Sequence, residues 1–182
     1  MNKHTGSSYD AIARQYAAKV DSQPWNAFYE RPGVISLLPD VANTSVLDAG
    51  CGSGWYSQYL LERGARVTAF DINGDFVELT RERSGNRARV FQSNLAEPLT
   101  FAENNEFDVA VCALVMHYLQ DWEPALREIH RILKPSGVFV FSTHHPFNDW
   151  KLFEREDYFA TELLEDEFQG IGKVNSARFT LI

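Results

Sequence analysis

Apolar residues follow two patterns along this chain: short continuous runs, and stripes at spacings of three and four. Short apolar runs bounded by turn residues are typical of strands buried on both faces of a parallel sheet. Such runs predict strands at residues 45–49, 66–70, 88–92, 107–113 and 138–142. The stripes between them predict helices at 55–63, 74–83 and 121–133. Strands that alternate with helices in this way predict an α/β fold with a doubly wound, mostly parallel sheet.

Residues 1–40 precede this alternation and are expected to be helical. A helix capped by Ser7 or Ser8 is expected to end near Val20, and a second helical region is expected over 25–38. Aromatic residues in this region are candidates for a lid over a binding site: Tyr9, Tyr16, Trp25, Phe28 and Tyr29. Arg31 lies beside them and can hold an acidic ligand, although a solvent-exposed arginine is the simpler expectation.

We interpret residues 1–182 as one domain, with a helical N-terminal lid region at 1–40, a core at 45–146 and a substrate-side segment at 147–182. The last segment leaves the set of C-terminal strands incomplete. Its strand-like run, 173–181, is expected to cover the open edge formed by residues 138–142, either within the chain or in a partner chain, because an unpaired apolar edge favours association.

The first predicted strand leads directly into a glycine-rich turn. Residues 46–54 read Val-Leu-Asp-Ala-Gly-Cys-Gly-Ser-Gly, and a helix is predicted from Trp55 onward. This is a nucleotide-binding element, because glycines accept positive φ and let the backbone approach a ligand closely. The dinucleotide fingerprint G-x-G-x-x-G requires glycine where this chain has Trp55. The turn is instead G-x-G-x-G, built from Gly50, Gly52 and Gly54.

Ligands of doubly wound sheets bind at the carboxyl ends of the strands. Asp71 ends the second predicted strand, 23 residues after Asp48, where a carboxylate can accept hydrogen bonds from both ribose hydroxyls. Ile72 follows and can pack on an adenine ring. Asn94 lies just after the third predicted strand.

Three further motifs extend this pattern and resemble one enzyme family. The first motif is the predicted strand 107–113 with Leu114 directly after it. The second is residues 126–137, which read Leu-Arg-Glu-Ile-His-Arg-Ile-Leu-Lys-Pro-Ser-Gly. The third is residues 9–16, which fit the pattern Tyr-Asp-x-Ile-Ala-x-x-Tyr. Together with the glycine turn they resemble the class I, Rossmann-like S-adenosylmethionine (SAM)-dependent methyltransferases, small bacterial members of methyltransferase type 11. The resemblance covers roughly residues 8–146. Where the family has glycine in the turn at 134–137, this chain has Ser136, which a type I turn accepts.

The resemblance implies a SAM-dependent methyltransferase that acts on a small-molecule acceptor and releases S-adenosylhomocysteine (SAH). It implies that the cofactor is bound by Tyr16, Asp48, Gly50, Gly52, Gly54, Asp71, Ile72, Asn94, Leu95 and Leu114. In the family an Asp commonly stands at the position of Asn94 and accepts from the adenine amino group. An amide oxygen can accept the same hydrogen bond.

Methyl transfer is an in-line displacement, so a base is needed only when the nucleophile arrives protonated. The candidates at strand ends are His117, Tyr118, His144 and His145, and the imidazole of histidine titrates in the useful range. The adjacent pair His144 and His145 is a poor metal site, since neighbouring side chains of an extended segment point to opposite faces. No metal is therefore expected.

The net charge and the composition of the chain limit the kinds of partner that are expected. A net charge of −8 and the absence of a Lys/Arg block disfavour nucleic acid, and the longest apolar run, 109–116, is too short to cross a membrane. The two cysteines, Cys51 and Cys112, fit free thiols in the cytoplasm, with the protein a monomer or a homodimer. Two alternatives stay open: a catalytically silent SAM-binding or regulatory protein, and an NAD-dependent oxidoreductase.

Overall fold

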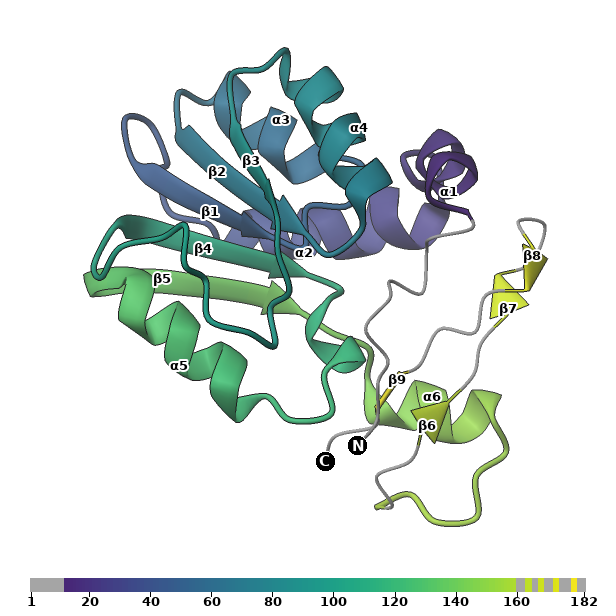
Figure 1. Ribbon diagram of the computed structural model, residues 1–182. Helices are drawn as coiled ribbons and strands as arrows, with labels where there is room; N and C mark the ends of the chain where they lie inside the picture. The colour runs from purple at the N-terminus through teal and green to yellow at the C-terminus, as the bar shows by residue number, and fades with distance from the viewer. Residues whose placement is uncertain (1–11, 160–162, 165–166, 169–171, 174–177, 180–182) are drawn as a thin grey trace.

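A computed structural model describes residues 12–159 together with the short strand segments 163–164, 167–168, 172–173 and 178–179. The centre of the molecule is a parallel sheet of five strands in the order β3-β2-β1-β4-β5 (Figure 1). The strands are β1 (Ser45–Ala49), β2 (Arg66–Asp71), β3 (Arg89–Gln92), β4 (Phe107–Ala113) and β5 (Leu133–Ser142). The predicted doubly wound parallel sheet is confirmed.

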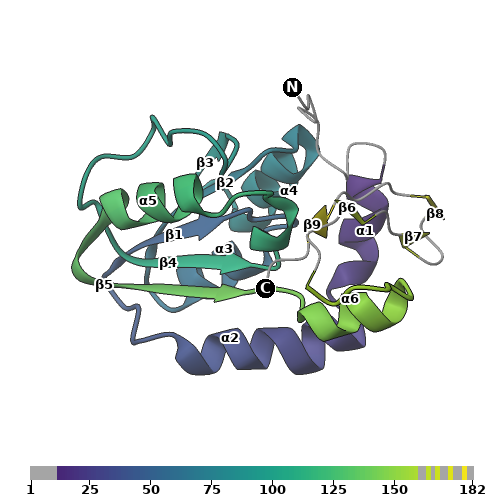
Figure 2. The same cartoon turned by 90° about the horizontal axis from the view of Figure 1, so that it is seen from below.

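Helices cover both faces of this sheet. They are α1 (Ala13–Val20), α2 (Arg31–Leu37), α3 (Trp55–Glu62), α4 (Gly74–Ser84), α5 (Glu123–Ile132) and α6 (Pro146–Leu152). Figure 2 shows α2 and α5 on opposite sides of β4 and β5. One apolar cluster joins α2, α3 and α4 to the sheet through Val34, Leu60 and Val77, and a second joins α5 through Ala125 and Ile129. Burial on both faces explains why the strands read as nearly continuous apolar runs.

The N-terminal helices depart from the expected boundaries. The predicted caps Ser7 and Ser8 lie outside the described residues, whereas the predicted end at Val20 is confirmed. The second region is helical, as expected, but it contains a π-helical turn, η1 (Asn26–Glu30), directly before α2. The apolar pattern did not predict this wider turn. The first helix packs on α4, where the Tyr16 and Phe76 rings meet edge to face.

The predicted turn at 134–137 forms an irregularity inside β5. The pairing with β4 jumps from Phe107 opposite Leu133 to Val109 opposite Val138. Ser136 has a φ of 66° at this point, so the expected type I turn is wrong, because its inner residues have negative φ. The position requires the left-handed conformation in which glycine carries no steric penalty.

Replacing Ser136 by glycine is expected to raise the free energy of unfolding by about 1 kcal/mol, because it removes the left-handed strain of an L-residue. Equilibrium denaturation in urea measures the change. The matched control is Ser36→Gly in α2, an exposed helical position where the same substitution should destabilise the protein. A loss of stability at both positions contradicts the left-handed assignment of Ser136.

The C-terminal segment does not close the sheet. The strand β6 (Leu163–Leu164) pairs with β9 (Arg178–Phe179), and β7 (Glu167–Phe168) pairs with β8 (Gly172–Lys173). Within the chain, the described residues of the run 173–181 therefore pair with β6 and β7 and not with β5, and the remainder of the run lies outside the described residues. Coverage of the β5 edge by a partner chain stays a prediction. No described strand pairs with the outer edge of β5. The helix α6 was not predicted, although Pro146 suits a first helical position.

Candidate functional site

A cavity of about 490 Å³ opens at the carboxyl ends of the strands. Strands β2 and β3 lie on one side of β1, and β4 and β5 lie on its other side. The strand order therefore reverses next to β1, and this reversal is the topological switch point of the sheet. Ligands of doubly wound sheets bind there, and the volume falls in the range of small-molecule sites. The predicted residues on the cavity wall are Tyr16, Gly50, Gly52, Asp71, Ile72, Asn94, Leu95 and Leu114.

Glycine is required at the three positions of the turn for different structural reasons. All have positive φ: 74° at Gly50, 52° at Gly52 and 79° at Gly54. A Cβ on Gly50 would lie 2.4 Å from a Val115 methyl carbon, and one on Gly54 would lie 2.9 Å from the Thr80 Cα. A Cβ on Gly52 meets no atom within 4 Å. Packing therefore explains Gly50 and Gly54, whereas Gly52 faces open space at the cavity wall.

Gly54 itself does not line the cavity. It precedes α3 and lets that helix approach the backbone of α4 at Thr80. This placement corrects the expectation of direct cofactor contact at Gly54 and gives the residue a packing role.

Asp71 connects the end of β2 to the glycine turn. One carboxylate oxygen accepts from the Gly52 amide at 2.9 Å, and the other accepts from the Asn73 amide at 2.9 Å. Burial raises the pKa of Asp71 to about 6, against the opposing effect of these amide donors. The turn and the carboxylate thus form one unit on the cavity wall.

Asp48 lies beneath the turn and not on the cavity wall. It is 1% exposed, and its carboxylate accepts a 2.6 Å hydrogen bond from the Ser57 hydroxyl of α3. Burial raises its pKa to about 6, with the nearby charge of Asp71 adding to the effect and the Ser57 bond opposing it. This corrects the expectation that Asp48 contacts the cofactor directly: it fastens α3 to β1.

Replacing Asp48 by asparagine is expected to stabilise the protein above pH 6. The folded pKa of about 6 exceeds the ordinary 3.8, so ionised Asp48 lowers stability as the pH rises from about 4 to 6, and the cost is complete above that window. At pH 8 the variant should gain about 1 to 3 kcal/mol over the wild type, and the gain should shrink toward pH 4. Urea denaturation at several pH values measures it. A pH-independent difference contradicts the burial of an ionisable Asp48.

The loops after β3 and β4 complete the cavity wall. The Asn94 side-chain oxygen accepts from the Ala96 amide at 2.9 Å, so Asn94 shapes its own loop. Leu114 has a φ of 55°, a conformation rare for leucine, and its amide donates to the Ser142 carbonyl at 3.0 Å. Backbone strain of this kind persists where the surroundings enforce it and is concentrated at functional sites.

Of the four predicted acid–base residues, Tyr118 lines the cavity and the three histidines do not. The buried His117 ring stacks on His144, with 4.2 Å between ring centroids, and His144 lies 3.7 Å from the buried Asp149 carboxylate. The His145 ring accepts from the Phe147 amide at 3.1 Å and caps α6. His144 and His145 therefore have different roles: His144 packs on His117 near Asp149, and His145 caps α6. The described residues include no group of three or more His, Cys, Asp or Glu able to hold a metal ion.

Sequence reasoning missed Glu30 on the cavity wall and gave solvent exposure as the simpler expectation for Arg31. Both residues line the cavity, and Arg31 is only 6% exposed. A helical period over 25–38 could not place them, because the π-helical turn shifts the register just before Arg31. The expected aromatic lid is only partly present. Tyr16 lines the cavity, Tyr9 lies outside the described residues, and Trp25, Phe28 and Tyr29 are 76–80% exposed.

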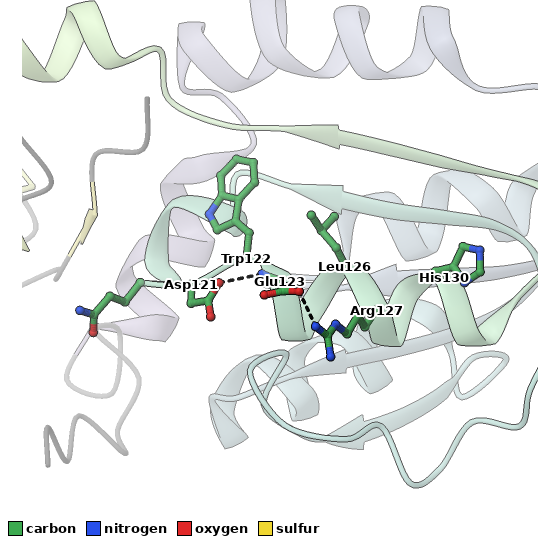
Figure 3. A pocket seen from close by; sticks show the side chains of 7 residues that line it. Asp121, Trp122, Glu123, Leu126, Arg127 and His130 are labelled. Carbon is green, nitrogen blue, oxygen red and sulfur yellow. Dashed lines mark hydrogen bonds and ion pairs between the residues drawn. The ribbon is translucent and has the colours of Figure 1, made fainter. Parts of the chain in front are cut away.

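A second, shallow pocket lies along the start of α5 (Figure 3). Its wall includes Trp122, Leu126 and His130, with the ion pair between Glu123 and Arg127. The Asp121 carboxylate accepts from the Glu123 amide at 2.9 Å, just before α5 begins. These polar groups bond to one another at the surface, and we assign the functional site to the cavity at the strand ends.

The fold and the cavity define a class I methyltransferase architecture, and comparison with known proteins agrees. Residues 47–141 match the family described as "Methyltransferase domain". This is more than half of the chain, which therefore belongs to the SAM-dependent methyltransferase family. Among the helices of the described residues, none has the length and apolarity needed to cross a bilayer.

Individual relatives are similar over much of the chain. A malonyl-[acyl-carrier protein] O-methyltransferase of Salmonella typhimurium is 31% identical over 144 residues, which cover 79% of this chain and 55% of that protein. An uncharacterised Haemophilus influenzae protein is 31% identical over 128 residues, or 66% of this chain and 50% of that one. The chain thus spans about half the length of these curated relatives.

Solved structures share the fold. A SAM-dependent methyltransferase from Mesorhizobium loti is 29% identical with a TM-score of 0.62, covering 70% of this chain and 56% of that chain. A TehB-like SAM-dependent methyltransferase from Corynebacterium glutamicum is 25% identical with a TM-score of 0.60, covering 92% of this chain and 94% of that chain.

Proposed function

We propose that this protein transfers the methyl group of SAM to an acceptor and releases SAH. The observation that carries the proposal is the pairing of Gly52 with Asp71 on the cavity wall. The position of a Gly52 Cβ is open, which leaves room for a ligand against the backbone, and a buried carboxylate lies beside it. Methyltransferase-family membership supports the same conclusion.

The residues of the wall fit SAM. The Asp71 carboxylate accepts from backbone amides, and its two oxygens together offer about four acceptor positions, so acceptor capacity remains for a ribose hydroxyl. Ile72, Asn94 and Leu95 follow β2 and β3 on the same wall, where they would surround the adenine ring. When bound, SAM supplies an electrophilic methyl group on its sulfonium. The task of this chain is then to position the cofactor and the acceptor and to exclude water.

For the acceptor we propose a carboxylate. None of the three predicted histidines lines the cavity, and Tyr118 is the one predicted acid–base residue that does. A carboxylate arrives already ionised near neutral pH, so it needs no base. Malonyl-[acyl-carrier protein] O-methyltransferases among the relatives support an acceptor of this kind. Both a free dicarboxylic acid and a carboxylate carried on a protein meet the description.

An acceptor panel monitored by SAH release tests this function. It should contain free malonate, a malonyl thioester of acyl carrier protein, a phenol and a primary amine, each incubated with SAM and the protein. We expect SAH to form with a carboxylate acceptor and not with the phenol or the amine. SAH formation with the amine alone contradicts the carboxylate. SAM binding without turnover for any acceptor favours the silent SAM-binding protein.

A further inference from the structure

The outward face of the second helical region carries no charged side chain. Residues 24–37 run without a break through η1 and α2. From Trp25 onward, the exposed positions of this helix are Trp25, Phe28, Tyr29, Pro32, Gly33, Ser36 and Leu37. They recur at intervals of three and four residues, so they lie along one face of the helix. We call this set of residues the outer strip.

The outer strip reverses the usual arrangement of a helix packed on a sheet, in which polar side chains face the solvent. The side chains of Trp25, Phe28 and Tyr29 are 76–80% exposed, and Leu37 is 66% exposed. Figure 2 shows α2 as the outermost labelled element on its side of the sheet. Contiguous apolar surface of this kind is rare on soluble monomers and marks a contact surface.

The opposite face of the same helix belongs to the cavity and the core. Asn26, Glu30 and Arg31 line the cavity, and Val34 packs in the apolar cluster beneath α2. No residue of the outer strip lines the cavity. The strip is therefore a surface separate from the site that we assign to SAM.

The area of the outer strip is sufficient for a specific contact between two proteins. Aromatic side chains bury about 150–250 Å² each, so the three aromatic residues offer roughly 350–600 Å² per molecule at their observed exposure. When two such strips face each other and Pro32 and Leu37 are included, the contact reaches about 1,000 Å², the size at which an interface becomes specific.

The absence of charge on the outer strip indicates which partner it fits. The protein has a net charge of −8, so two copies repel each other unless they meet through uncharged surface. The strip provides such a surface. An anionic membrane or an acidic protein would be attracted by lysine and arginine, and the strip contains neither. A second copy of this chain therefore fits the strip best.

The shape of the outer strip also allows it to pack against itself. Pro32, Gly33 and Ser36 form a low stretch, and a Cβ on Gly33 meets no atom within 4 Å. The aromatic residues lie at one end of this stretch, and Leu37 lies at the other. When two such helices pack antiparallel across a twofold axis near Gly33, the aromatic end of each lies on the small residues of the other.

We propose that the outer strip is the contact surface of a homodimer, in which the 24–37 helices of two copies pack antiparallel across a twofold axis. Each copy keeps its own cavity, because the cavity residues Asn26, Glu30 and Arg31 are on the inner face of the helix. The dimer does not depend on the proposed function, since it concerns a surface outside the site.

Sedimentation velocity of the full chain over a range of micromolar concentrations tests the dimer. We expect the wild type to pass from monomer to dimer as the concentration rises. Phe28→Glu should raise the dissociation constant of the dimer roughly a hundredfold or more, because the new carboxylate would lose its water in the contact. Leu37→Glu, at the other end of the strip, should have the same effect. Both positions are exposed, so each variant should keep a cooperative urea transition.

The matched control is Phe159→Glu, which places the same charge on a phenylalanine that is 73% exposed and lies outside the outer strip; the dimer should persist. A wild type that stays monomeric at every concentration overturns the proposal. So does a dimer that withstands both Phe28→Glu and Leu37→Glu, which would place the contact on another surface, such as the edge of β5. Cosedimentation of a monomeric wild type with vesicles of anionic lipid, lost in Phe28→Glu, would assign the strip to a membrane and equally overturn the dimer.

Discussion

Replacing Gly52 by valine is expected to abolish SAM binding while the protein still unfolds cooperatively. The Gly52 φ of 52° is strained for a β-branched residue, and a Cβ there enters open space on the cavity wall instead of touching the protein. A bulky side chain would therefore occupy the volume of the ligand. We expect the affinity for SAM to fall by roughly a thousandfold or more, the cost of displacing a ligand held against the backbone.

The matched control for this substitution is Gly85→Val. Gly85 has a φ of 59° and no neighbouring atom within 4 Å of a Cβ, but it ends α4 and does not line the cavity. Backbone strain should lower the stability of both variants, yet only Gly52→Val should lose SAM in calorimetry. Normal SAM binding by Gly52→Val would show that the turn does not approach the cofactor.

Replacing Asp71 by alanine is expected to weaken SAM binding by about 2 to 3 kcal/mol, or roughly a hundredfold. The change removes the acceptor for the ribose hydroxyls and also leaves the Gly52 and Asn73 amides without their carboxylate. The turn then loses its attachment to β2. The control is Asp75→Ala, which removes an exposed carboxylate from the first turn of α4 and should leave the affinity unchanged.

The pH dependence of binding provides a second readout for Asp71. Its pKa of about 6 means that the carboxylate becomes protonated as the pH falls through this value. A protonated acid has lost acceptor capacity, so the affinity for SAM should decrease below about pH 6 and stay constant above it. Calorimetry between pH 5 and 8 measures this profile. Wild-type affinity in Asp71→Ala, or an affinity that rises on acidification, contradicts a ribose-binding Asp71.

The sheet and the glycine turn could be predicted because their physical causes are local. Strands β1 and β4 have the predicted bounds, since a strand buried on both faces must be apolar along its length. The turn was recognisable because positive φ favours glycine at all three positions and close packing requires it at Gly50 and Gly54. Asp71 could be placed because it ends a strand on the ligand-binding edge.

The other features of the site depend on tertiary contacts, which a local sequence pattern does not predict. Arg31 is buried only because Asp21 and Trp55 come from other elements to hold it. Asp48 precedes the turn like a ligand residue, but its carboxylate points to Ser57 beneath the cavity. The left-handed Ser136 and the helix cap at His145 likewise arise from backbone conformations that residue types did not indicate.

Parallel calorimetric titrations of the wild-type protein with SAM and with NAD test the central claim most directly. Gly54 is followed by Trp55 where the dinucleotide fingerprint requires glycine, and the cavity wall combines an open Gly52 with the buried carboxylate of Asp71. We predict that SAM binds at a single site per chain and that NAD gives no measurable heat. Binding of NAD, or the absence of SAM binding by the folded protein, would contradict the assignment of this cavity to SAM.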